Sequence, residues 1–373
     1  MARNRINMNE RIQKLRNALA DGEKEIDAYL ILNIESSDRI NQRYLIDFDS
    51  SLGCTLIMED RVVFLTDSRY FDAAREELKQ PELKKIDSRP VETTAELINE
   101  LELGAVAIDE NDVSLGRFKK LKGLLEGTGI VQLDGTLREI RRKKSSEELE
   151  LHQKAADIAD RAFSHLLDFV EPGISEKDVA LELEFFMRKN GADCVSFDPI
   201  VAVGPRSAQP HAHPGKEVIK SGELLLVDMG AKYGGYCSDL TRTVYFGEPT
   251  EKVKEIYQLV LEAQQTGLRE LGPGMSGRAV HEKAAEVIEE GGYGDNFDHG
   301  LGHGVGLEVH EGPRLSETSE DTLEPGMVVT VEPGIYLPGW GGIRIEDMVR
   351  VTEEGCERFS HAPKEEIINP LEG

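Results

Sequence analysis

The stretch PGISEKDVALELEFFMRKNG, residues 172–191, returns in altered form as PGMSGRAVHEKAAEVIEEGG, residues 273–292. Both copies begin with Pro-Gly, an apolar residue and Ser, and four residues after each Ser stands a valine, Val179 or Val280. Each copy also follows a long amphipathic helical pattern. A recurrence of this kind indicates an internal duplication, which governs how the rest of this region is arranged.

Two further pairs of segments recur in the same order. GELLLVD (222–228) matches GMVVTVE (326–332), and each resembles a buried strand that ends in a carboxylate, Asp228 or Glu332. GGYCSDLTRTV and GGIRIEDMVRV match next, with Asp239 and Glu346 each four residues after the second glycine. Three matches in one order predict a duplicated helix–helix–strand–strand unit whose copies pack about a pseudo-twofold axis.

The predicted axis brings the recurring acids together. Asp228 and Asp239 of one copy would approach Glu332 and Glu346 of the other, and four ionised carboxylates in one cleft would raise each other's pKa steeply. Two divalent cations would neutralise them, with bridging carboxylates holding the ions about 3.5–4 Å apart. Acids at strand ends are usually only solvated surface residues. Their recurrence at matched positions favours the metal site.

Three histidines share the glycine-rich stretch HGLGHGVGLEVHEGP, residues 299–313. His299 and His303 have the spacing of a helical zinc pair, but the Glu of HExxH is missing and the glycines disfavour a helix. Glycine instead lets extended backbone pass close to a crowded centre, so that one imidazole reaches a metal. His303 and His310 would face opposite sides of a regular strand unless a bulge or a glycine kink reverses the parity. His299 is interpreted as structural.

A second pair of histidines, His211 and His213, lies in GPRSAQPHAHPG, a proline-bounded loop before the first carboxylate strand. This position predicts residues at the rim of the same site.

The first part of the chain predicts a separate α/β domain with a supporting role, because it contains no cluster of ligands or acid–base residues. Apolar β-type runs alternate with helical stretches: AYLIL (28–32), CTLIM (54–58), RVVFL (61–65), FDAAREELKQ (71–80) and TTAELINELE (93–102). The basic run Arg141–Lys144 reads as a solvated linker. Ser145 and Glu148 then have capping-box spacing at the start of a long helix. We therefore expect domains at 1–142 and 143–373.

The amino-acid composition indicates which classes of binding partner are not expected. Acidic residues number 70 against 44 basic ones, a formal net charge of −26. The molecule should repel phosphate backbones and anionic lipid, so nucleic acid and membranes are not expected partners. Four cysteines without CxxC spacing indicate reduced thiols and a cytoplasmic protein. No apolar run approaches the length of a membrane span.

Several motifs carry a resemblance to a known superfamily. LLLVDMGAKYGGYCSDLTRT, LGHGVGLEVHE, VEPGIYLP and GGIRIED resemble, in order, the metal and substrate motifs of the methionine aminopeptidase/prolidase/creatinase superfamily. NQRYLIDF and LTDSRY resemble the N-terminal domain of prolidases, Xaa-Pro aminopeptidases and creatinases. The resemblance implies an α+β pita-bread catalytic domain with an internal pseudo-twofold repeat, preceded by an α/β creatinase/prolidase-like domain.

The resemblance also implies a dinuclear centre. Asp239 and Glu346 match positions that bridge both metals, Asp228 matches a ligand of one ion, and His303 and Glu332 match ligands of the other. An oxygen-rich site with one imidazole and no thiolate suits Mn²⁺ or Co²⁺, with Fe²⁺ and Zn²⁺ as alternatives.

Roles in catalysis follow from the same resemblance. A water bridging the two ions would become hydroxide near neutral pH and attack the scissile carbonyl. His211 and His310 match acid–base and substrate-orienting histidines, and Glu332 matches a proton shuttle. Arg314 and Arg344 match residues that contact substrate or brace the centre, although Arg314 could equally be a solvated surface residue.

The function implied is cleavage of an Xaa-Pro bond in short proline-containing peptides, by a homodimeric Xaa-Pro dipeptidase (prolidase) or Xaa-Pro aminopeptidase. A methionine aminopeptidase or other aminopeptidase is an alternative, although the N-terminal domain speaks against the first. Creatinase-type hydrolases lose the metal ligands that this chain retains. A catalytically silent peptide-binding module is the alternative of another class. One departure is Arg206, where the family often has Asn.

Overall fold

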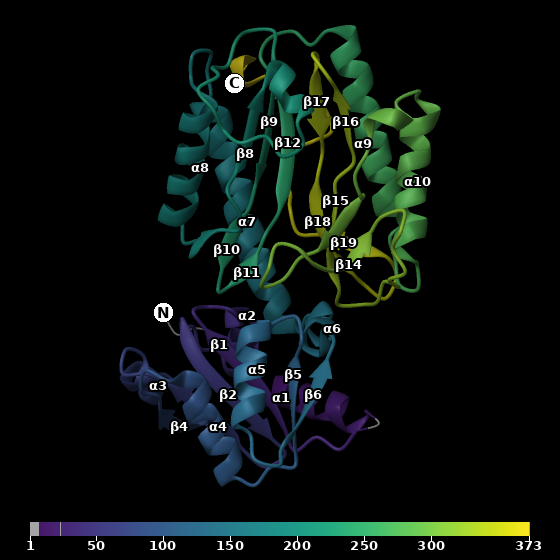
Figure 1. The fold of residues 1–373 in the computed structure, drawn as a ribbon. Coiled ribbons are helices and arrows are strands. Elements are labelled where there is room, and N and C mark those ends of the chain that lie inside the picture. The colour runs from purple at the N-terminus through teal and green to yellow at the C-terminus, as the bar shows by residue number, and fades with distance from the viewer. Residues whose placement is uncertain (1–6, 23, 373) are drawn as a thin grey trace. The chain divides into compact units, whose positions relative to one another are not determined.

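The computed structural model describes residues 7–22 and 24–372. Its internal contacts divide the chain into two compact units, Met1–Ile140 and Arg141–Gly373, called unit 1 and unit 2 below. Figure 1 labels the elements of each unit along the chain. Among the described residues, no helix has the length and apolar character needed to cross a membrane.

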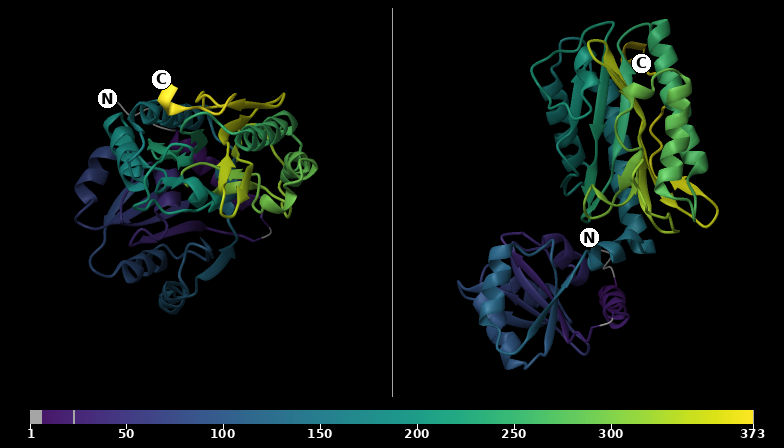
Figure 2. Two further views of the ribbon diagram at one scale, coloured as in Figure 1. Left: turned by 90° about the horizontal axis from the view of Figure 1, so that it is seen from above. Right: turned by 45° about the vertical axis from the view of Figure 1, so that its right-hand side comes forward.

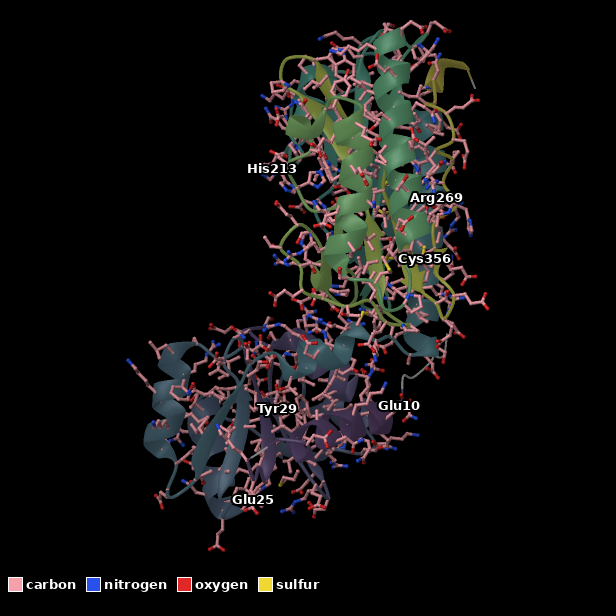
Figure 3. All side chains as sticks on the ribbon, turned by 90° about the vertical axis from the view of Figure 1, so that its right-hand side faces the viewer. Glu10, Glu25, Tyr29, His213, Arg269 and Cys356 are labelled. Carbon is pink, nitrogen blue, oxygen red and sulfur yellow. The ribbon has the colours of Figure 1, made fainter. Side chains whose placement is uncertain are left out.

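Unit 1 is built on one mixed sheet of six strands, in the order β4-β3-β2-β1-β5-β6. The central strand β1 is buried along its whole length, which explains its unbroken apolar sequence. Tyr29 of this strand lies inside the unit, whereas Glu10 and Glu25 are exposed (Figure 3). The strands and helices predicted from the alternating pattern are all present. Strands are β1 (Ala28–Ile34), β2 (Leu52–Met58), β3 (Val62–Thr66), β4 (Glu82–Lys85), β5 (Ala105–Asp109) and β6 (Gly129–Leu133); helices are α1 (Met8–Ala20), α2 (Arg39–Ile46), α3 (Phe71–Glu77), α4 (Pro90–Glu100), α5 (Leu115–Leu124) and α6 (Thr136–Arg142).

The helices of unit 2 form two pairs, one in each copy of the predicted repeat. Ser145 opens the first helix with the predicted capping box, in which Glu148 bonds back to the Ser145 backbone. Ser175 and Ser276, the serines of the recurring segments, cap the second helix of each pair through their side chains. The pairs are α7 (Ser146–Phe169) with α8 (Glu176–Lys189), and α9 (Glu251–Glu270) with α10 (Gly277–Glu290).

The strands of unit 2 follow the same duplication. In each copy a strand, a short hairpin region and a returning strand occur in order, so β9 corresponds to β15 and β12 to β18. The helix pairs lie outside the strands (Figures 1 and 2). This is the expected pita-bread arrangement. The strands and short helices are β7 (Cys194–Val195), β8 (Ile200–Val203), η1 (Gly204–Ala208), β9 (Leu224–Met229), β10 (Ala231–Tyr233), β11 (Tyr236–Cys237), β12 (Leu240–Tyr245), η2 (Gly294–Asn296), β13 (Gly302–Gly304), β14 (Glu311–Leu315), β15 (Val328–Val331), β16 (Gly334–Leu337), β17 (Gly341–Arg344), β18 (Asp347–Val351), β19 (Cys356–Arg358) and η3 (Pro370–Glu372).

The interpretation of Arg141–Lys144 as a solvated linker is wrong. Arg141 and Lys144 are 4% and 6% exposed. Both pair with the buried carboxylate of Glu311, through Arg141 Nη2 at 2.6 Å and Lys144 Nζ at 3.5 Å. A buried cation requires a partner charge, and here that partner comes from a distant part of the sequence. Arg141 and Lys144 are therefore internal to unit 2, whereas Lys143 between them is exposed.

Candidate metal centre

The five predicted ligands all lie at or beside the inner strands of unit 2. Asp228 is in β9, Asp239 directly precedes β12, and the register Asp228↔Thr241 places these acids at one end of the strand pair. In the second copy, Glu332 follows β15 and Glu346 precedes β18, at the equivalent end. His303 is the middle residue of β13, which pairs with β15.

The side chains of these residues converge. One ligand atom each from Asp239, His303 and Glu346 lies within 4.8 Å of the others. His303 Nε2 is 3.3 Å from Glu332 Oε1 and 3.7 Å from Asp239 Oδ2. Asp228 is 9% exposed and its Oδ2 accepts a bond from Arg344 Nη2 at 2.7 Å. Carboxylates from both copies of the repeat therefore share one site with a single imidazole.

Burial and mutual repulsion disturb the protonation of the cluster. Burial, then the charges of Glu346 and Asp228, raise the pKa of Asp239 well above its usual value. Burial also leads the causes that raise the pKa of Asp228 and of Glu346. For Glu332, burial opposes ionisation, but the hydrogen bond and charge of His303 lower its pKa to about 2. The four carboxylates carry more negative charge than the neighbouring Arg344 and His303 can offset.

Divalent cations fit this donor set. Asp228 Oδ1 is buried and, within the described part of the chain, has no hydrogen-bond partner. Buried polar atoms are normally satisfied, so an unpartnered carboxylate oxygen beside three other acids suits a cation ligand. Oxygen donors with one imidazole match the preferences of Mn²⁺, Co²⁺, Fe²⁺ and Zn²⁺.

The orientation of His303 is set by its own backbone. Its Nδ1 lies 3.1 Å from the Gly304 carbonyl, which can only accept, so Nδ1 carries the proton and donates. Nε2 is thereby directed at the carboxylates. A ligand histidine held through its other nitrogen in this way is pre-oriented for a metal.

The chain reverses direction between the two histidines of this stretch. β13 ends at Gly304 and β14 begins at Glu311, and the two strands pair antiparallel, with a register shift between His303 and Gly304. His310 directly precedes β14, so it does not share a strand with His303, and the centroids of the two rings lie 4.3 Å apart. The expectation of one extended strand is therefore wrong, and the turn between the strands brings the two rings together.

The glycines of the stretch make room for neighbouring chain. A Cβ on Gly302 would collide with the Thr330 carbonyl, and one on Gly304 would collide with the Gly312 carbonyl. A Cβ on Gly306 would enter the carboxylate of Glu311. Each glycine therefore permits an approach that a side chain would block.

Arg344 braces the site from a buried position. Its guanidinium donates to Asp228 Oδ2, to Tyr336 Oη at 2.8 Å, and to the Pro210 carbonyl at 3.4 Å. Tyr336 in turn lies 3.0 Å from His299 Nε2, while His299 Nδ1 lies 2.7 Å from the Gly300 carbonyl. Because a carbonyl oxygen can only accept, Nδ1 carries the proton of the neutral ring and donates to Gly300. The Tyr336 hydroxyl therefore donates to Nε2.

Sequence reasoning gave Tyr336 no role and left His299 as structural. Tyr336 stands in VEPGIYLP, four residues after Glu332, so the motif contained it. Its link to Arg344 depends on the β16–β17 pairing, in which Gly334 faces Arg344. Residue spacing alone does not reveal such a contact.

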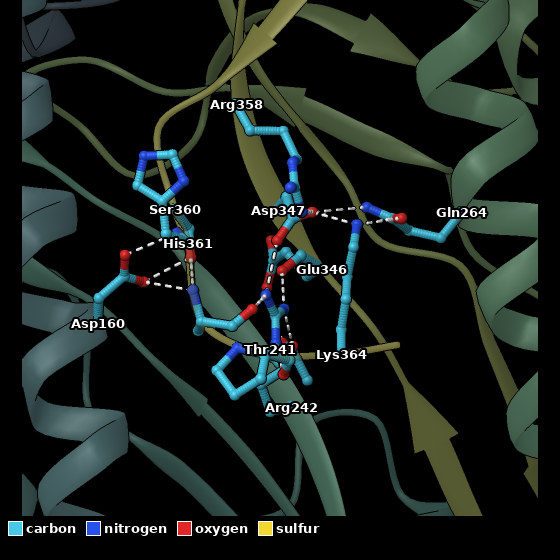
Figure 4. A network of polar contacts seen from close by, with 12 residues as sticks. Asp160, Thr241, Arg242, Gln264, Glu346, Asp347, Arg358, Ser360, His361 and Lys364 are labelled. Atoms are coloured by element: carbon cyan, nitrogen blue, oxygen red, sulfur yellow. Dashed lines mark hydrogen bonds and ion pairs between the residues drawn. The ribbon is translucent and has the colours of Figure 1, made fainter. Parts of the chain in front are cut away.

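A second buried network supports Glu346 from behind (Figure 4). Asp347, fully buried, accepts from Arg242 Nη2 at 2.7 Å and from Gln264 Nε2 at 3.1 Å, and it also pairs with Lys364. Arg242 donates to the backbone carbonyl of Glu346 at 2.5 Å. Although burial opposes ionisation, Arg242 and Lys364 hold the pKa of Asp347 well below its usual value. The C-terminal segment is thus tied to the strand that presents Glu346.

Three of the predicted substrate-side residues, His211, His310 and Arg314, are exposed. His310 is exposed beside His303, and burial together with the His303 charge lowers its pKa. His211 is also exposed and acts electrostatically on His310, and the carbonyl of the preceding Pro210 is held by Arg344. Arg314 is exposed and faces His303 across the β13–β14 pair.

His213 differs from His211. It is exposed, and its backbone carbonyl, rather than its ring, accepts from Arg206 Nη2 at 2.7 Å. Arg206 also pairs with the buried Glu176 at 3.0 Å, while Glu176 accepts from the backbone of Gly215 at 2.8 Å. This arginine therefore braces the loop that carries both histidines.

Comparison with known families matches nearly the whole chain. The model of metallopeptidase family M24 matches residues 150–353. The model of the creatinase/prolidase N-terminal domain matches residues 11–143.

Individual relatives match at full length. Uncharacterized peptidase YqhT of Bacillus subtilis is 43% identical, over 96% of this chain and 99% of that protein. The solved structure of an Xaa-Pro dipeptidase from Bacillus anthracis has a TM-score of 0.91 at 41% identity, covering 97% of this chain and 100% of that one. That of an X-Pro aminopeptidase from Thermotoga maritima has a TM-score of 0.88 at 38% identity, covering 94% and 98%.

Proposed function

This chain belongs to metallopeptidase family M24, and from that premise we propose that it is a dinuclear-metal-dependent exopeptidase that hydrolyses the Xaa-Pro bond of short peptides. The observation that carries the proposal is the convergence of Asp239, Glu346, His303 and Glu332 in one buried cluster. Relatives of similar length act on Xaa-Pro peptides according to their names.

The ligand assignment is part of the proposal. Asp239 and Glu346 would bridge two divalent ions, Asp228 would bind one of them, and His303 with Glu332 would bind the other. The ligand atoms of Asp239, His303 and Glu346 within 4.8 Å of one another, and the Oδ1 of Asp228 without a hydrogen-bond partner among the described residues, support this ligand set. Mn²⁺ or Co²⁺ is the preferred pair, with Fe²⁺ or Zn²⁺ as alternatives.

The chemistry that the ions supply when bound is activation of a water molecule and polarisation of the scissile carbonyl. The chain itself must hold the substrate and move protons. Glu332 takes the proton of the attacking water. His310, whose exposed ring stands beside the cluster, relays that proton to the proline nitrogen as the bond breaks. His211 orients the substrate from the opposite loop.

Two arginines complete the proposed site. Arg344 fixes Asp228 and the loop before His211 through bonds to Asp228 Oδ2 (2.7 Å) and the Pro210 carbonyl (3.4 Å). Arg314 is free to meet the carboxylate end of a peptide from its exposed position opposite His303.

The proposal includes a cytoplasmic location and a homodimeric state for the protein. All four cysteines are free, as expected in a reducing compartment. The catalytic domain is assigned to 143–373 and the supporting domain to 1–142, close to the residues matched by the two family models.

The test is metal reconstitution. The protein is stripped with chelator and reloaded separately with Mn²⁺, Co²⁺ or Zn²⁺, and each form is assayed on Ala-Pro, Ala-Pro-Gly and Met-Ala-Ser. We expect Ala-Pro turnover, with Mn²⁺ or Co²⁺ best. Turnover of Ala-Pro-Gly alone would assign an Xaa-Pro aminopeptidase, and turnover of Met-Ala-Ser alone would overturn Xaa-Pro specificity.

The matched control is Asp239→Asn, which removes one bridging carboxylate with little change in shape. It should lower kcat/KM by about three orders of magnitude or more. If no metal gives activity and Asp239→Asn still binds proline-containing peptides as the wild type does, the chain is a silent peptide-binding module.

A further inference from the structure

The buried ion cluster at the start of unit 2 lies directly next to a proposed catalytic residue in sequence. Glu311 has a side chain that is 6% exposed, and it receives Arg141 Nη2 at 2.6 Å and Lys144 Nζ at 3.5 Å. The side chain of Lys144 is 1% exposed. Nothing in the proposed chemistry uses these three charges.

The Glu311 carboxylate also closes the turn that precedes it. Its Oε1 accepts from the backbone N–H of Glu308 at 3.1 Å. Gly306, at the other end of the same turn, has no Cβ, so the carboxylate can occupy the space beside it. The backbone from Gly306 to Glu311 is therefore folded around this single carboxylate.

His310 lies inside that turn and depends on it. Its ring is exposed, and among residues 7–22 and 24–372 no hydrogen bond to the ring is found. Its ring contact is the one with His303, at 4.3 Å between centroids. Without an anchor of its own, the ring is placed by the backbone on either side, and Glu311 is the next residue.

We propose that Glu311 is a positioning residue for His310: the buried cations Arg141 and Lys144 hold its carboxylate, which fixes the turn that sets the His310 ring against His303. The role in catalysis rests on the proposed function, because only that function assigns His310 a catalytic step. The positioning of the His310 ring by Glu311 does not depend on the proposed function. Pairing of Glu311 with two buried cations makes the anchor rigid, since each charge is costly to leave unpaired.

The geometric part is tested by NMR on the full chain with [¹³Cε1]-histidine, in the metal-free and the Zn²⁺-loaded forms. Nine histidines give a countable spectrum, and His310→Gln assigns the signal. In Glu311→Gln, the contact signal between the His303 and His310 rings should be lost. The ring of His165, which stacks on Phe186 at 4.3 Å in the first copy, serves as the reference that stays unchanged.

The matched control variant is Glu308→Gln. Glu308 also binds Arg141, but its side chain is 45% exposed and it is not adjacent to His310. It should retain the ring contact. Should Glu311→Gln fail to fold, Glu311→Asp, which keeps the charge but shortens its reach, replaces it. A ring contact that persists in whichever Glu311 variant folds overturns the proposal.

The catalytic part is tested by a double-mutant cycle on the metal-loaded protein. Glu311→Gln should lower kcat/KM by about tenfold or more in the wild-type background and by less than about twofold in a His310→Gln background. Equal factors in both backgrounds would mean a general structural role and would refute positioning through His310. If the wild type cleaves none of the peptides, the proposed function fails while the NMR result still decides the geometry.

Discussion

Asp239 experiences strong electrostatic repulsion in the site, because its buried carboxylate faces Glu346, Asp228 and Glu332. In metal-free protein this repulsion opposes folding. Asp239→Asn should therefore raise the stability of the metal-free form by about 1 kcal/mol, or ~2–4 °C in Tm. It should also abolish the Tm increase that Mn²⁺ gives the wild type. Thermal unfolding with chelator and with Mn²⁺ measures both effects.

The control for this prediction is Asp295→Asn, an exposed acid at η2, which should leave both Tm values unchanged. A metal-free Asp239→Asn protein that melts below the wild type would show that the carboxylate stabilises the fold instead.

We expect the stability of the protein to depend on pH through His152, which is not one of the predicted metal ligands. It is fully buried and its Nδ1 donates to the Cys237 carbonyl at 2.9 Å, and burial lowers its pKa from 6.5 to about 3. Below pH 6.5, His152 binds a proton in the unfolded chain but stays neutral in the folded chain. The stability present above pH 6.5 is therefore lost as pH falls towards 3, by up to about 1.4 kcal/mol per pH unit.

His152→Asn keeps a donor for the carbonyl but does not titrate. Urea unfolding at pH 7.5, 6 and 5 should show a shallower pH slope for this variant than for the wild type. His361→Asn, at an exposed histidine, is the comparison that should leave the slope intact. Identical slopes for wild type and His152→Asn would refute the assignment.

At the scale of elements, the packing of β13 against its neighbours depends on glycine residues. A Cβ on Gly302 would meet the Thr330 carbonyl of β15. Gly302→Ala should therefore cost about 1–3 kcal/mol of stability, and it should weaken Mn²⁺ binding because His303 moves with the strand. Denaturant titration and metal titration measure the two losses.

Gly123 in α5 offers the opposite case. No atom lies within 4 Å of a Cβ built there. Gly123→Ala should stabilise the protein by about 0.5–1 kcal/mol, since alanine favours a helix and restricts the unfolded chain. If Gly302→Ala were as stable as Gly123→Ala, close strand approach would not be the reason for the glycine.

Elements also show which parts of the site could be predicted. The acids Asp228, Asp239, Glu332 and Glu346 could be predicted because each lies at or directly beside the end of a strand in a repeated unit. The contact between the rings of His303 and His310 could not, because it depends on the chain reversal between β13 and β14, whereas the sequence pattern suggested one extended strand.

At the scale of the whole molecule, the formal charge of −26 predicts a dependence on salt. Like charges spread over the surface repel each other and weaken the compact state at low ionic strength. Raising NaCl from about 0.02 M to about 0.5 M, with chelator present, should increase the free energy of unfolding by on the order of 1 kcal/mol. Urea titrations at each salt concentration measure it, and a decrease would mean that attractive surface pairs dominate.

The overall architecture was largely predictable, since the duplication is visible in the sequence and the family motifs follow its order. The error at Arg141–Lys144 has a physical origin. Arg141 finds its partner Glu311 170 residues further along the chain, and local composition carries no trace of that pairing. A run of basic residues is interpreted as solvated when its acidic partners lie far away in the sequence.

The tie between Lys364 and Asp347 has a consequence for the order of synthesis. The bond from Thr241 to Glu346 already spans 105 residues, and the segment that secures the Glu346 strand from behind is made after that strand. A chain that grows from its N-terminus can fold unit 1 early, but it cannot brace the acid cluster fully until Lys364 has left the ribosome. Under the proposed function, divalent ions would then bind only after this segment has been made.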